Sequence, residues 1–260
     1  MQFLTNYPAL IINAPSNHGK HSRRDETSYL IISDLHIGIT KRLYDKGISI
    51  PSQIKGMLDR IHELKRISGA KNLIMLGDIK DKVPGTSWQE EMEIPNFLSR
   101  LKFDKIIIVK GNHDGNIEKL IPNKKKIKVV NYFNIGNYHL THGHRALKPS
   151  EMKTKKSETT IIIGHNQPHI QFQDDMKANY SEPVWVRGII MNAPKKTKKR
   201  SRRNTGVRLI IMPAFNELCG ATTVNKDKLL GPIAKNLDYK KTHIFLLDGT
   251  DLGKLSDFKK

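Results

Sequence analysis

Residue types that bind divalent metal ions recur at three places in the first half of this chain. In chain order the three sets are Asp34 with His36, Asp78, and Asn112 with His113. Carboxylate oxygen, imidazole nitrogen and amide oxygen together suit hard to borderline cations such as manganese, iron, zinc or magnesium. A single Asp-x-His pair is most often only a polar turn, whereas three sets in succession indicate a metal site.

Each set follows a short apolar segment that has the length of a buried strand. These segments are 29–33, 72–76 and 105–109. Between them, apolar residues spaced by three and four predict an amphipathic helix over 51–67, and a second helix is predicted over 88–101 with Met92 on its apolar face. Alternating strands and helices predict a parallel sheet with right-handed crossovers. Because the carboxyl ends of parallel strands meet at one edge, the three sets should converge there.

The second half of the chain has more strand candidates than helix candidates. Apolar blocks separated by turn-rich or charged segments lie at 127–130, 138–141, 159–163, 184–190, 207–213 and 243–247, and a further strand is predicted within 5–14. We expect one α/β domain that covers residues 1–260.

The ordered motifs resemble the five successive motifs of the calcineurin-like metallophosphoesterases. They read DLH at 34–36, GD at 77–78, GNHD at 111–114, THGH at 141–144 and GH at 164–165. The finer wording, LGDIKDKVPGTSWQE, LTHGHRALKP and IMPAFNELCG, is most similar to small archaeal and bacterial members related to the SbcD nuclease. The resemblance covers roughly residues 28–220. It implies an α/β four-layer sandwich, in which two packed mixed β-sheets are flanked by helices.

The resemblance also implies a role for each motif residue. The first metal would be held by Asp34 and His36, with Asp78 bridging to a second metal, and the second metal would be completed by Asn112, His142 and His165. The metals would be two divalent ions, with manganese favoured and iron, zinc or magnesium as alternatives. A hydroxide bridging the metals would attack a phosphodiester. His113 would face the substrate and assist the leaving group, and Asp114 would orient His113.

One position departs from the family pattern. Members usually read Gly-His-x-His in the fifth motif, but this chain has Gln167 in place of the second histidine. An amide oxygen is a weaker donor than imidazole for most divalent transition ions. Three interpretations remain open: Gln167 binds the first metal through its oxygen, His169 bends in as a substitute, or water completes that metal.

The charge of the chain is strongly positive, because 45 Lys and Arg stand against 25 Asp and Glu, a net charge of +20. Such an excess favours polyanionic partners such as nucleic acid, but an AT-rich genome could also produce it. Seven basic residues lie within 195–203, and from these we select as nucleic-acid contacts Lys198, Lys199, Arg200, Arg202 and Arg203. The segment 192–206 is predicted to be a flexible basic insertion loop, and a merely solvated loop is the alternative.

Two further residues lie beside the predicted ligands. His144 either contacts a metal ligand or the substrate phosphate, or is an exposed loop histidine. Asp81 either accepts a hydrogen bond from a metal-binding histidine or is a solvated loop aspartate.

The predicted function is metal-dependent hydrolysis of phosphodiester bonds, in DNA or RNA. The rival hypotheses are a phosphatase or phosphodiesterase for small nucleotides, and a nucleic-acid-binding protein whose metal site is weakened at Gln167. One cysteine, no leader peptide and no apolar run of roughly 18 residues predict a cytoplasmic protein without membrane contact. The sequence does not identify a protein partner.

Overall fold

The computed structural model of the protein describes residues 1–15, 26–151, 159–191 and 207–258. The chain divides into two compact units. The N-terminal unit consists of Met1–Phe3, Ala9–Asn131 and Phe215–Cys219, and the C-terminal unit consists of Leu4–Pro8, Tyr132–Ala214 and Gly220–Lys260. Two short segments, Leu4–Pro8 and Phe215–Cys219, therefore belong to a different unit from the residues next to them in the chain.

Six strands form the sheet of the N-terminal unit in the part of the chain that the structure describes. In spatial order they are β1 (Gln2–Phe3), β2 (Leu10–Pro15), β3 (Glu26–Ile32), β4 (Asn72–Leu76), β5 (Lys105–Val109) and β6 (Ile127–Val130). The strands from β3 to β6 are parallel to one another. Strand β2 runs antiparallel to both of its neighbours, β1 and β3. Strand β4 in the middle of this sheet is buried along its whole length, which is typical of a strand with parallel neighbours.

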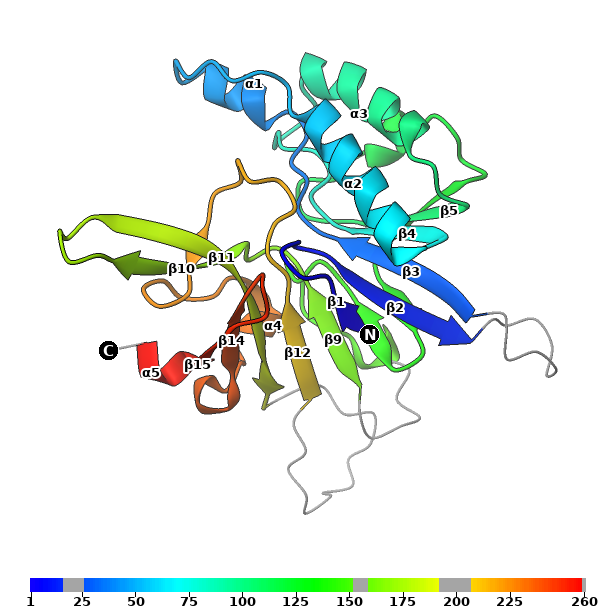
Figure 1. Ribbon diagram of the computed structural model, residues 1–260. Helices are drawn as coiled ribbons and strands as arrows, with labels where there is room; N and C mark the ends of the chain where they lie inside the picture. Colours follow the sequence, from blue (N-terminus) through cyan, green and yellow to red (C-terminus); the bar gives the residue numbers. More distant parts are fainter. Residues whose placement is uncertain (16–25, 152–158, 192–206, 259–260) are drawn as a thin grey trace. The chain divides into compact units, whose positions relative to one another are not determined.

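Helices α1 (Ile39–Tyr44), α2 (Ile54–Ser68) and α3 (Trp88–Arg100) and the short helix η1 (Ile117–Leu120) connect these strands. Figure 1 shows α2 and α3 beside each other on the same side of β3, β4 and β5. The predicted apolar stripe of α2 faces the core through Ile54, Met57, Leu58, Ile61 and Leu64. Gly69 ends this helix with a φ of 63°, a left-handed conformation that glycine adopts without steric cost.

The capping box at the start of α3 sets its first residue. The Ser87 hydroxyl accepts a hydrogen bond from the Glu90 backbone N–H, and the Glu90 side chain accepts one from the Ser87 backbone N–H. The buried apolar residues of this helix are Ile94, Phe97 and Leu98. The placement of Met92 on the buried face was wrong: its side chain is 60% exposed.

The second sheet lies in the C-terminal unit and contains nine strands among the residues described. They are β7 (Phe133–Ile135), β8 (Tyr138–Leu140), β9 (Thr160–Ile163), β10 (Pro168–Gln173), β11 (Asn179–Ile190), β12 (Val207–Ile211), β13 (Thr222–Thr223), β14 (His243–Leu246) and β15 (Asp251–Lys254). Strand β9 runs parallel to both β8 and β12, and β11 runs antiparallel to β10, β12 and β14. The short helices of this unit are η2 (Pro149–Glu151), α4 (Gly231–Ala234), η3 (Tyr239–Lys241) and α5 (Leu255–Phe258).

The mixed α/β class with two mixed sheets is thus confirmed, and so is the parallel order of β3, β4 and β5. Strands β1, β7, β10, β13 and β15 were not predicted, because segments that are very short or rich in polar residues carry little periodic signal. The single domain over residues 1–260 stays a prediction. The predicted insertion loop at 192–206 lies outside the described residues, although the strands that flank it pair directly through Ile190 and Val207.

His139 on β8 is a histidine buried inside the C-terminal unit. Its side chain is 1% exposed, Nδ1 lies 2.8 Å from Oδ1 of Asn134, and Nε2 has no hydrogen-bond partner among the described residues. Burial therefore lowers the pKa of His139 to about 4. The nearby charges have smaller effects on this pKa: Glu151 raises it and Arg145 lowers it.

We predict that this histidine makes the fold acid-sensitive. The unfolded chain takes up a proton near pH 6.5, whereas folded His139 does so only near pH 4, so stability present above 6.5 is lost as the pH falls to about 4. The expected loss is about 3 kcal/mol. Urea unfolding of wild type and His139→Phe across this interval measures it, with His243→Phe as control. Equal pH slopes for wild type and His139→Phe would contradict the assignment.

Candidate metal centre

The predicted ligands of the N-terminal unit follow three adjacent strands whose ends are level. Ile32 of β3 pairs with Met75 of β4, and Leu76 of β4 pairs with Val109 of β5. Asp34 and Asp78 each come two residues after their strand. The parallel register therefore brings the loops after β3, β4 and β5 to one edge of the sheet, as the sequence predicted.

The first two loops continue the parallel strands as paired backbone. The Asp34 N–H donates to the Gly77 carbonyl at 3.2 Å, and the His36 N–H donates to the Asp78 carbonyl at 2.9 Å. Beyond them, the Ile37 N–H donates to the Ile79 carbonyl at 2.8 Å. The backbone positions of the first and second motifs are thus fixed against each other before any side chain takes part.

Left-handed backbone is concentrated at the predicted metal ligands. In the described part of the chain eight non-glycine residues have positive φ, and five of them are predicted ligands: Asp34 (54°), His36 (42°), Asp78 (49°), His165 (67°) and Gln167 (45°). This conformation is unfavourable for residues with a side chain and persists where the surrounding structure enforces it, which is common at functional sites. Gln167 shares this feature with four of the six ligands of the recognised motifs.

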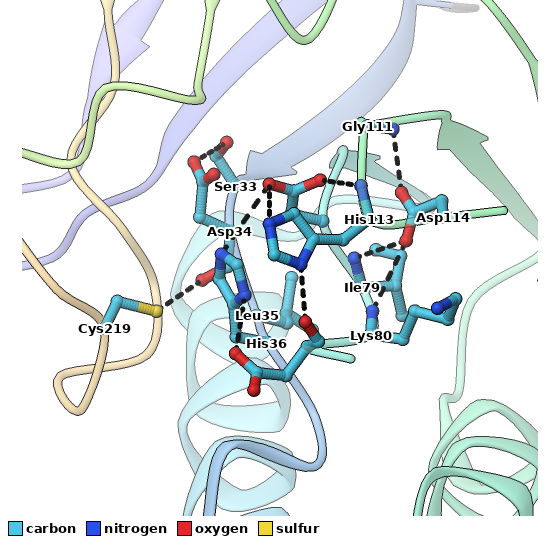
Figure 2. A network of polar contacts seen from close by, with 12 residues as sticks. Ser33, Asp34, Leu35, His36, Ile79, Lys80, Gly111, His113, Asp114 and Cys219 are labelled. Atoms are coloured by element: carbon cyan, nitrogen blue, oxygen red, sulfur yellow. Dashed lines mark hydrogen bonds and ion pairs between the residues drawn. The ribbon is translucent and has the colours of Figure 1, made fainter. Parts of the chain in front are cut away.

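Asp34, His36 and Asp78 form a compact group of buried ligand atoms. One ligand atom from each residue lies within 4.8 Å of the others. The Ser33 hydroxyl lies 2.5 Å from Oδ2 of Asp34 (Figure 2). The same hydroxyl lies 3.0 Å from the Leu76 carbonyl, so Ser33 links the Asp34 carboxylate to the end of β4. Two carboxylates and an imidazole fit a divalent cation, which would also offset the cost of burying the negative charges.

Asp81 orients the imidazole of His36. Nδ1 of His36 donates to Oδ1 of Asp81 at 3.1 Å, which leaves Nε2 facing Asp78, 3.7 Å from Oδ2. Arg42 binds the same Asp81 carboxylate through Nε at 2.7 Å and Nη2 at 3.1 Å. A carboxylate behind a metal-binding histidine fixes the tautomer that presents Nε2 to the metal. Asp81 therefore has the first of the two roles considered for it, and the sequence did not suggest Arg42.

The electrostatics of this group favour a bound positive charge. Burial opposes protonation of His36, but the hydrogen bond with Asp81 and the surrounding carboxylates outweigh it and raise the pKa of the imidazole. Burial would raise the pKa of Asp81, but its hydrogen bonds with His36 and Arg42 outweigh this and lower it. A metal ion would take the place of the proton that the site attracts.

His113 lies beside this group with its ring held by the backbone. Its Nδ1 donates to the Asp81 carbonyl at 2.5 Å, and its backbone N–H donates to Oδ1 of Asp78 at 2.9 Å. The His36 and His113 rings meet edge to face with centroids 4.9 Å apart. Nε2 of His113 lies 4.0 Å from Oδ2 of Asp78, and the side chain is 27% exposed. Asn112, the preceding residue, is exposed at the same loop.

Asp114 holds the loop that carries His113. Its carboxylate accepts hydrogen bonds from the backbone N–H groups of Ile79 at 2.8 Å, Lys80 at 3.3 Å and Gly111 at 2.8 Å (Figure 2). These contacts fasten the loop after β5 to the loop after β4. The His113 ring itself donates its hydrogen bond to the Asp81 carbonyl, a contact that the sequence did not predict.

Gly111 allows this close approach. A Cβ at position 111 would lie 2.0 Å from Oδ1 and 2.4 Å from the backbone nitrogen of Asp78. Atoms at such distances overlap, so any side chain here would displace the aspartate. Glycine in the GNHD motif is a packing requirement of the site.

A segment from the second half of the sequence supports the first motif. Within 215–219, Asn216 donates from Nδ2 to the Leu35 carbonyl at 2.7 Å, and the Cys219 thiol lies 3.6 Å from the Asp34 carbonyl (Figure 2). Burial and the nearby carboxylates raise the pKa of the Cys219 thiol well above its ordinary value, so it remains a neutral donor.

The C-terminal unit gathers the remaining predicted histidines. His142 and His165 each come two residues after a strand, β8 and β9, and their ring centroids are 5.1 Å apart. The ring of His144 lies 5.4 Å from that of His142 and 6.2 Å from that of His165. His144 therefore belongs to the same cluster.

Asn166 and the segment around Leu230 fix the loop that carries His165. Asn166 pairs with both backbone groups of Leu230, accepting from its N–H at 2.7 Å and donating to its carbonyl at 3.3 Å. A Cβ at Gly231 would lie 2.5 Å from the Gly143 carbonyl oxygen and 3.3 Å from Cδ2 of His165. His169 lies on β10 and belongs to none of the candidate metal-binding groups among the described residues.

The predicted nucleic-acid contacts other than His144 cannot be placed. Lys198, Lys199, Arg200, Arg202 and Arg203 all lie outside the described residues. None of the helices in the described part of the chain combines the length and the apolar character that crossing a bilayer requires.

Replacing Gly111 by alanine tests the geometry of the candidate metal centre. Because the new Cβ would displace Asp78, we expect Gly111→Ala to weaken Mn²⁺ binding on the order of tenfold or more. Calorimetric titration of the protein with Mn²⁺ measures this. Gly115→Ala in the same loop is the matched control, since its Cβ would meet nothing within 4 Å. Equal affinities for the two variants would count against the site.

Comparisons with known proteins bear on the family and the fold of this chain. A search of curated proteins found no match. The structure is similar to that of Pseudomonas putida nuclease MPE, with a TM-score of 0.51 and 19% identity over 86% of this chain and 87% of the other. It is also similar to Yfce, a phosphoesterase from E. coli, with a TM-score of 0.40 and 14% identity over 87% of this chain and 97% of the other. The model of the calcineurin-like phosphoesterase family matches residues 27–211, more than half of the sequence, and the chain therefore belongs to that family.

Proposed function

We propose that this protein is a dinuclear metal-dependent phosphodiesterase that cleaves nucleic acid. Membership of the calcineurin-like phosphoesterase family assigns hydrolysis of phosphoester bonds. The choice of a diester and of nucleic acid is the proposal. The observation that carries it is the buried group of Asp34, His36 and Asp78 with the imidazole of His113 at its side.

The proposed ligands follow the family motifs. By these motifs Asp34, His36 and Asp78 would hold the first metal, and Asp78 would also serve the second metal, together with Asn112, His142 and His165. We assign Gln167 to the first metal through its amide oxygen, supported by its left-handed φ of 45°, which the other ligands after β3, β4 and β9 share. Manganese suits this mixture of oxygen and nitrogen donors. When bound, the two cations neutralise the phosphoryl charge and make hydroxide available near neutral pH.

His113 supplies the proton for the leaving group. Its Nδ1 remains bonded to the Asp81 carbonyl, so Nε2 is the nitrogen that faces the substrate. As hydroxide forms the new phosphorus–oxygen bond, the bond to the leaving oxygen breaks, and that oxygen takes a proton from Nε2 of the doubly protonated imidazole, which keeps its Nδ1 proton. The proton that water releases in forming hydroxide balances the one that His113 supplies. Such general-acid assistance typically contributes about 10²–10⁴-fold. Asp81 and Asp114 act through His113 and its loop, without meeting the substrate.

The net charge of +20 supports a polyanionic substrate. A small nucleotide needs few cationic contacts, whereas a strand of nucleic acid gains affinity from each phosphate that the protein neutralises. The basic run at 195–203 is the natural candidate for these contacts, and His144 is a candidate for contact with the reacting phosphate.

The activity is tested with Mn²⁺ on a nitrophenyl phosphodiester, a dinucleotide, a nitrophenyl phosphomonoester, and single-stranded DNA and RNA. We expect wild type to cleave both diesters and Asp78→Asn to be inactive. His113→Ala should lose about 10²–10⁴-fold on the dinucleotide. The loss should be smaller on the nitrophenyl diester, because its leaving group needs no proton. Asp59→Asn, an exposed change on α2, is the control.

Three outcomes would contradict the proposal. Absence of metal-dependent turnover on any substrate, nucleic acid included, would favour a binding protein. Cleavage of small substrates with DNA and RNA neither cut nor bound at low salt would favour a small-nucleotide enzyme. Equal losses on both diesters would remove His113 from the acid role.

The basic run has its own test. Replacing its seven Lys and Arg residues at 195–203 by serine should weaken binding of single-stranded nucleic acid. The salt dependence should flatten by about 0.7 in logarithmic slope for each lost phosphate contact. Hydrolysis of the nitrophenyl diester should be unchanged. Replacing Lys124 and Lys125 by serine controls for the general loss of charge. An unchanged slope would identify the run as a solvated loop.

A further inference from the structure

We propose that Glu90 is a positioning residue that fixes, through the backbone of residues 81–82, the two histidines on which the proposed function rests. Glu90 is the last residue of the segment LGDIKDKVPGTSWQE quoted above, but it lies outside the five motifs, and the resemblance assigns it no role. It lies in the first turn of α3, and its side chain is completely buried. A buried carboxylate costs free energy unless hydrogen-bond donors satisfy it. The donors to Glu90 are backbone N–H groups of the loop after β4.

Three backbone N–H groups donate to the Glu90 carboxylate. Oε1 accepts from Asp81 at 2.8 Å and from Lys82 at 2.6 Å, and Oε2 accepts from Ser87 at 2.5 Å. The Asp81 N–H is shared with the Ile37 carbonyl at 3.1 Å. Among the described residues Glu90 accepts the hydrogen bond of the Lys82 N–H, so its carboxylate fixes the N–H side of the peptide group between Asp81 and Lys82.

That same peptide group carries the contact to His113. The carbonyl of Asp81 accepts from Nδ1 of His113 at 2.5 Å, while the Asp81 carboxylate accepts from Nδ1 of His36 at 3.1 Å. A rotation of the peptide would move the carbonyl away from His113 and tilt the carboxylate away from His36. Glu90 thus determines two imidazole orientations without touching either ring.

Glu90 also packs against the first motif loop. A Cβ at Gly38, two residues after His36, would lie 2.6 Å from Cγ of Glu90. Gly38 itself has a φ of 102°. The loop after β3 therefore closes on the aliphatic part of the same side chain whose carboxylate holds the loop after β4.

The opposite side of the loop is held by a second buried charge. Lys80 is 1% exposed, and its Nζ donates to the Lys82 carbonyl at 2.6 Å and to the Gly85 carbonyl at 2.5 Å. The peptide groups of Lys82 are therefore fixed by Glu90 on the N–H side and by Lys80 on the C=O side. Two oppositely charged side chains keep an irregular loop in one conformation.

Glu90→Gln is the critical variant because it keeps the shape and removes one acceptor. Whichever way the amide is oriented, its NH₂ group meets at least one backbone N–H that now has no acceptor. Two controls separate this from general effects. Glu91→Gln makes the same charge change at an exposed position in the same turn. Ser87→Ala removes the helix cap but leaves the Glu90 carboxylate in place.

We expect Glu90→Gln to weaken Mn²⁺ binding by about tenfold to a hundredfold and to lower kcat with little change in KM. In metal-free protein above neutral pH, nitrogen-15 spectra should show His113 as the Nδ1–H tautomer in wild type and as a mixture in Glu90→Gln. Both controls should resemble wild type in Mn²⁺ affinity and tautomer. The spectra and the metal titration need no substrate, so they test Glu90 even if the proposed hydrolysis fails.

A measurement on wild type keeps the proposal testable should Glu90→Gln not fold. Hydrogen exchange of the Lys82 amide should be slow, with protection close to that of the buried strands, because its acceptor is buried. Rapid exchange of this amide would overturn the proposal. So would a folded Glu90→Gln protein with the Mn²⁺ affinity and the His113 tautomer of Glu91→Gln.

Discussion

The close approach of the loops after β3, β4 and β5 is the constraint on which the rest of the site depends. The last parallel pairs are Ile32 with Met75 and Leu76 with Val109, and the first two loops then continue to exchange backbone hydrogen bonds. Gly111 is needed because a Cβ there would overlap Asp78. Asp34, His36 and Asp78 are forced into left-handed backbone. These backbone conformations cost conformational free energy, but they fix the positions of the ligands, as a metal site requires.

Charge balance explains why so many acidic groups can be buried here. Asp34, Asp78 and Asp81 are each at most 5% exposed. Arg42 compensates one of them directly, and backbone N–H groups and the Ser33 hydroxyl satisfy others. The raised pKa of His36 shows that the group still attracts a positive charge. A divalent cation would complete this balance, and an anionic substrate would then meet a site that is no longer negative.

The two units use the same local design. In one unit Asp34 and Asp78, and in the other His142 and His165, come two residues after a strand that has a parallel neighbour. The loops of His165 and Asp78 are held by residues that are not predicted ligands: Asn166 in one unit and Asp114 in the other. Gln167 differs from the family in side chain but keeps the left-handed backbone of a ligand. The substitution therefore changes the strength of a donor while the loop geometry that presents it is retained.

The sequence by itself determined the parallel β3–β4–β5 order, the two long helices and the ligand types at the strand ends. These follow from local periodicity and from the position of polar residues after apolar runs. It also contained the capping signal Ser87-x-x-Glu90, which predicts a helix start but not a bond to Lys82. Only the tertiary structure decided that Arg42 joins Asp81, that Gly111 faces Asp78 and that Asn216 supports Leu35. These pairs are separated by 33 to 181 positions and have no common period. Which side chain satisfies a buried backbone group therefore depends on chain packing, and a linear pattern does not encode it.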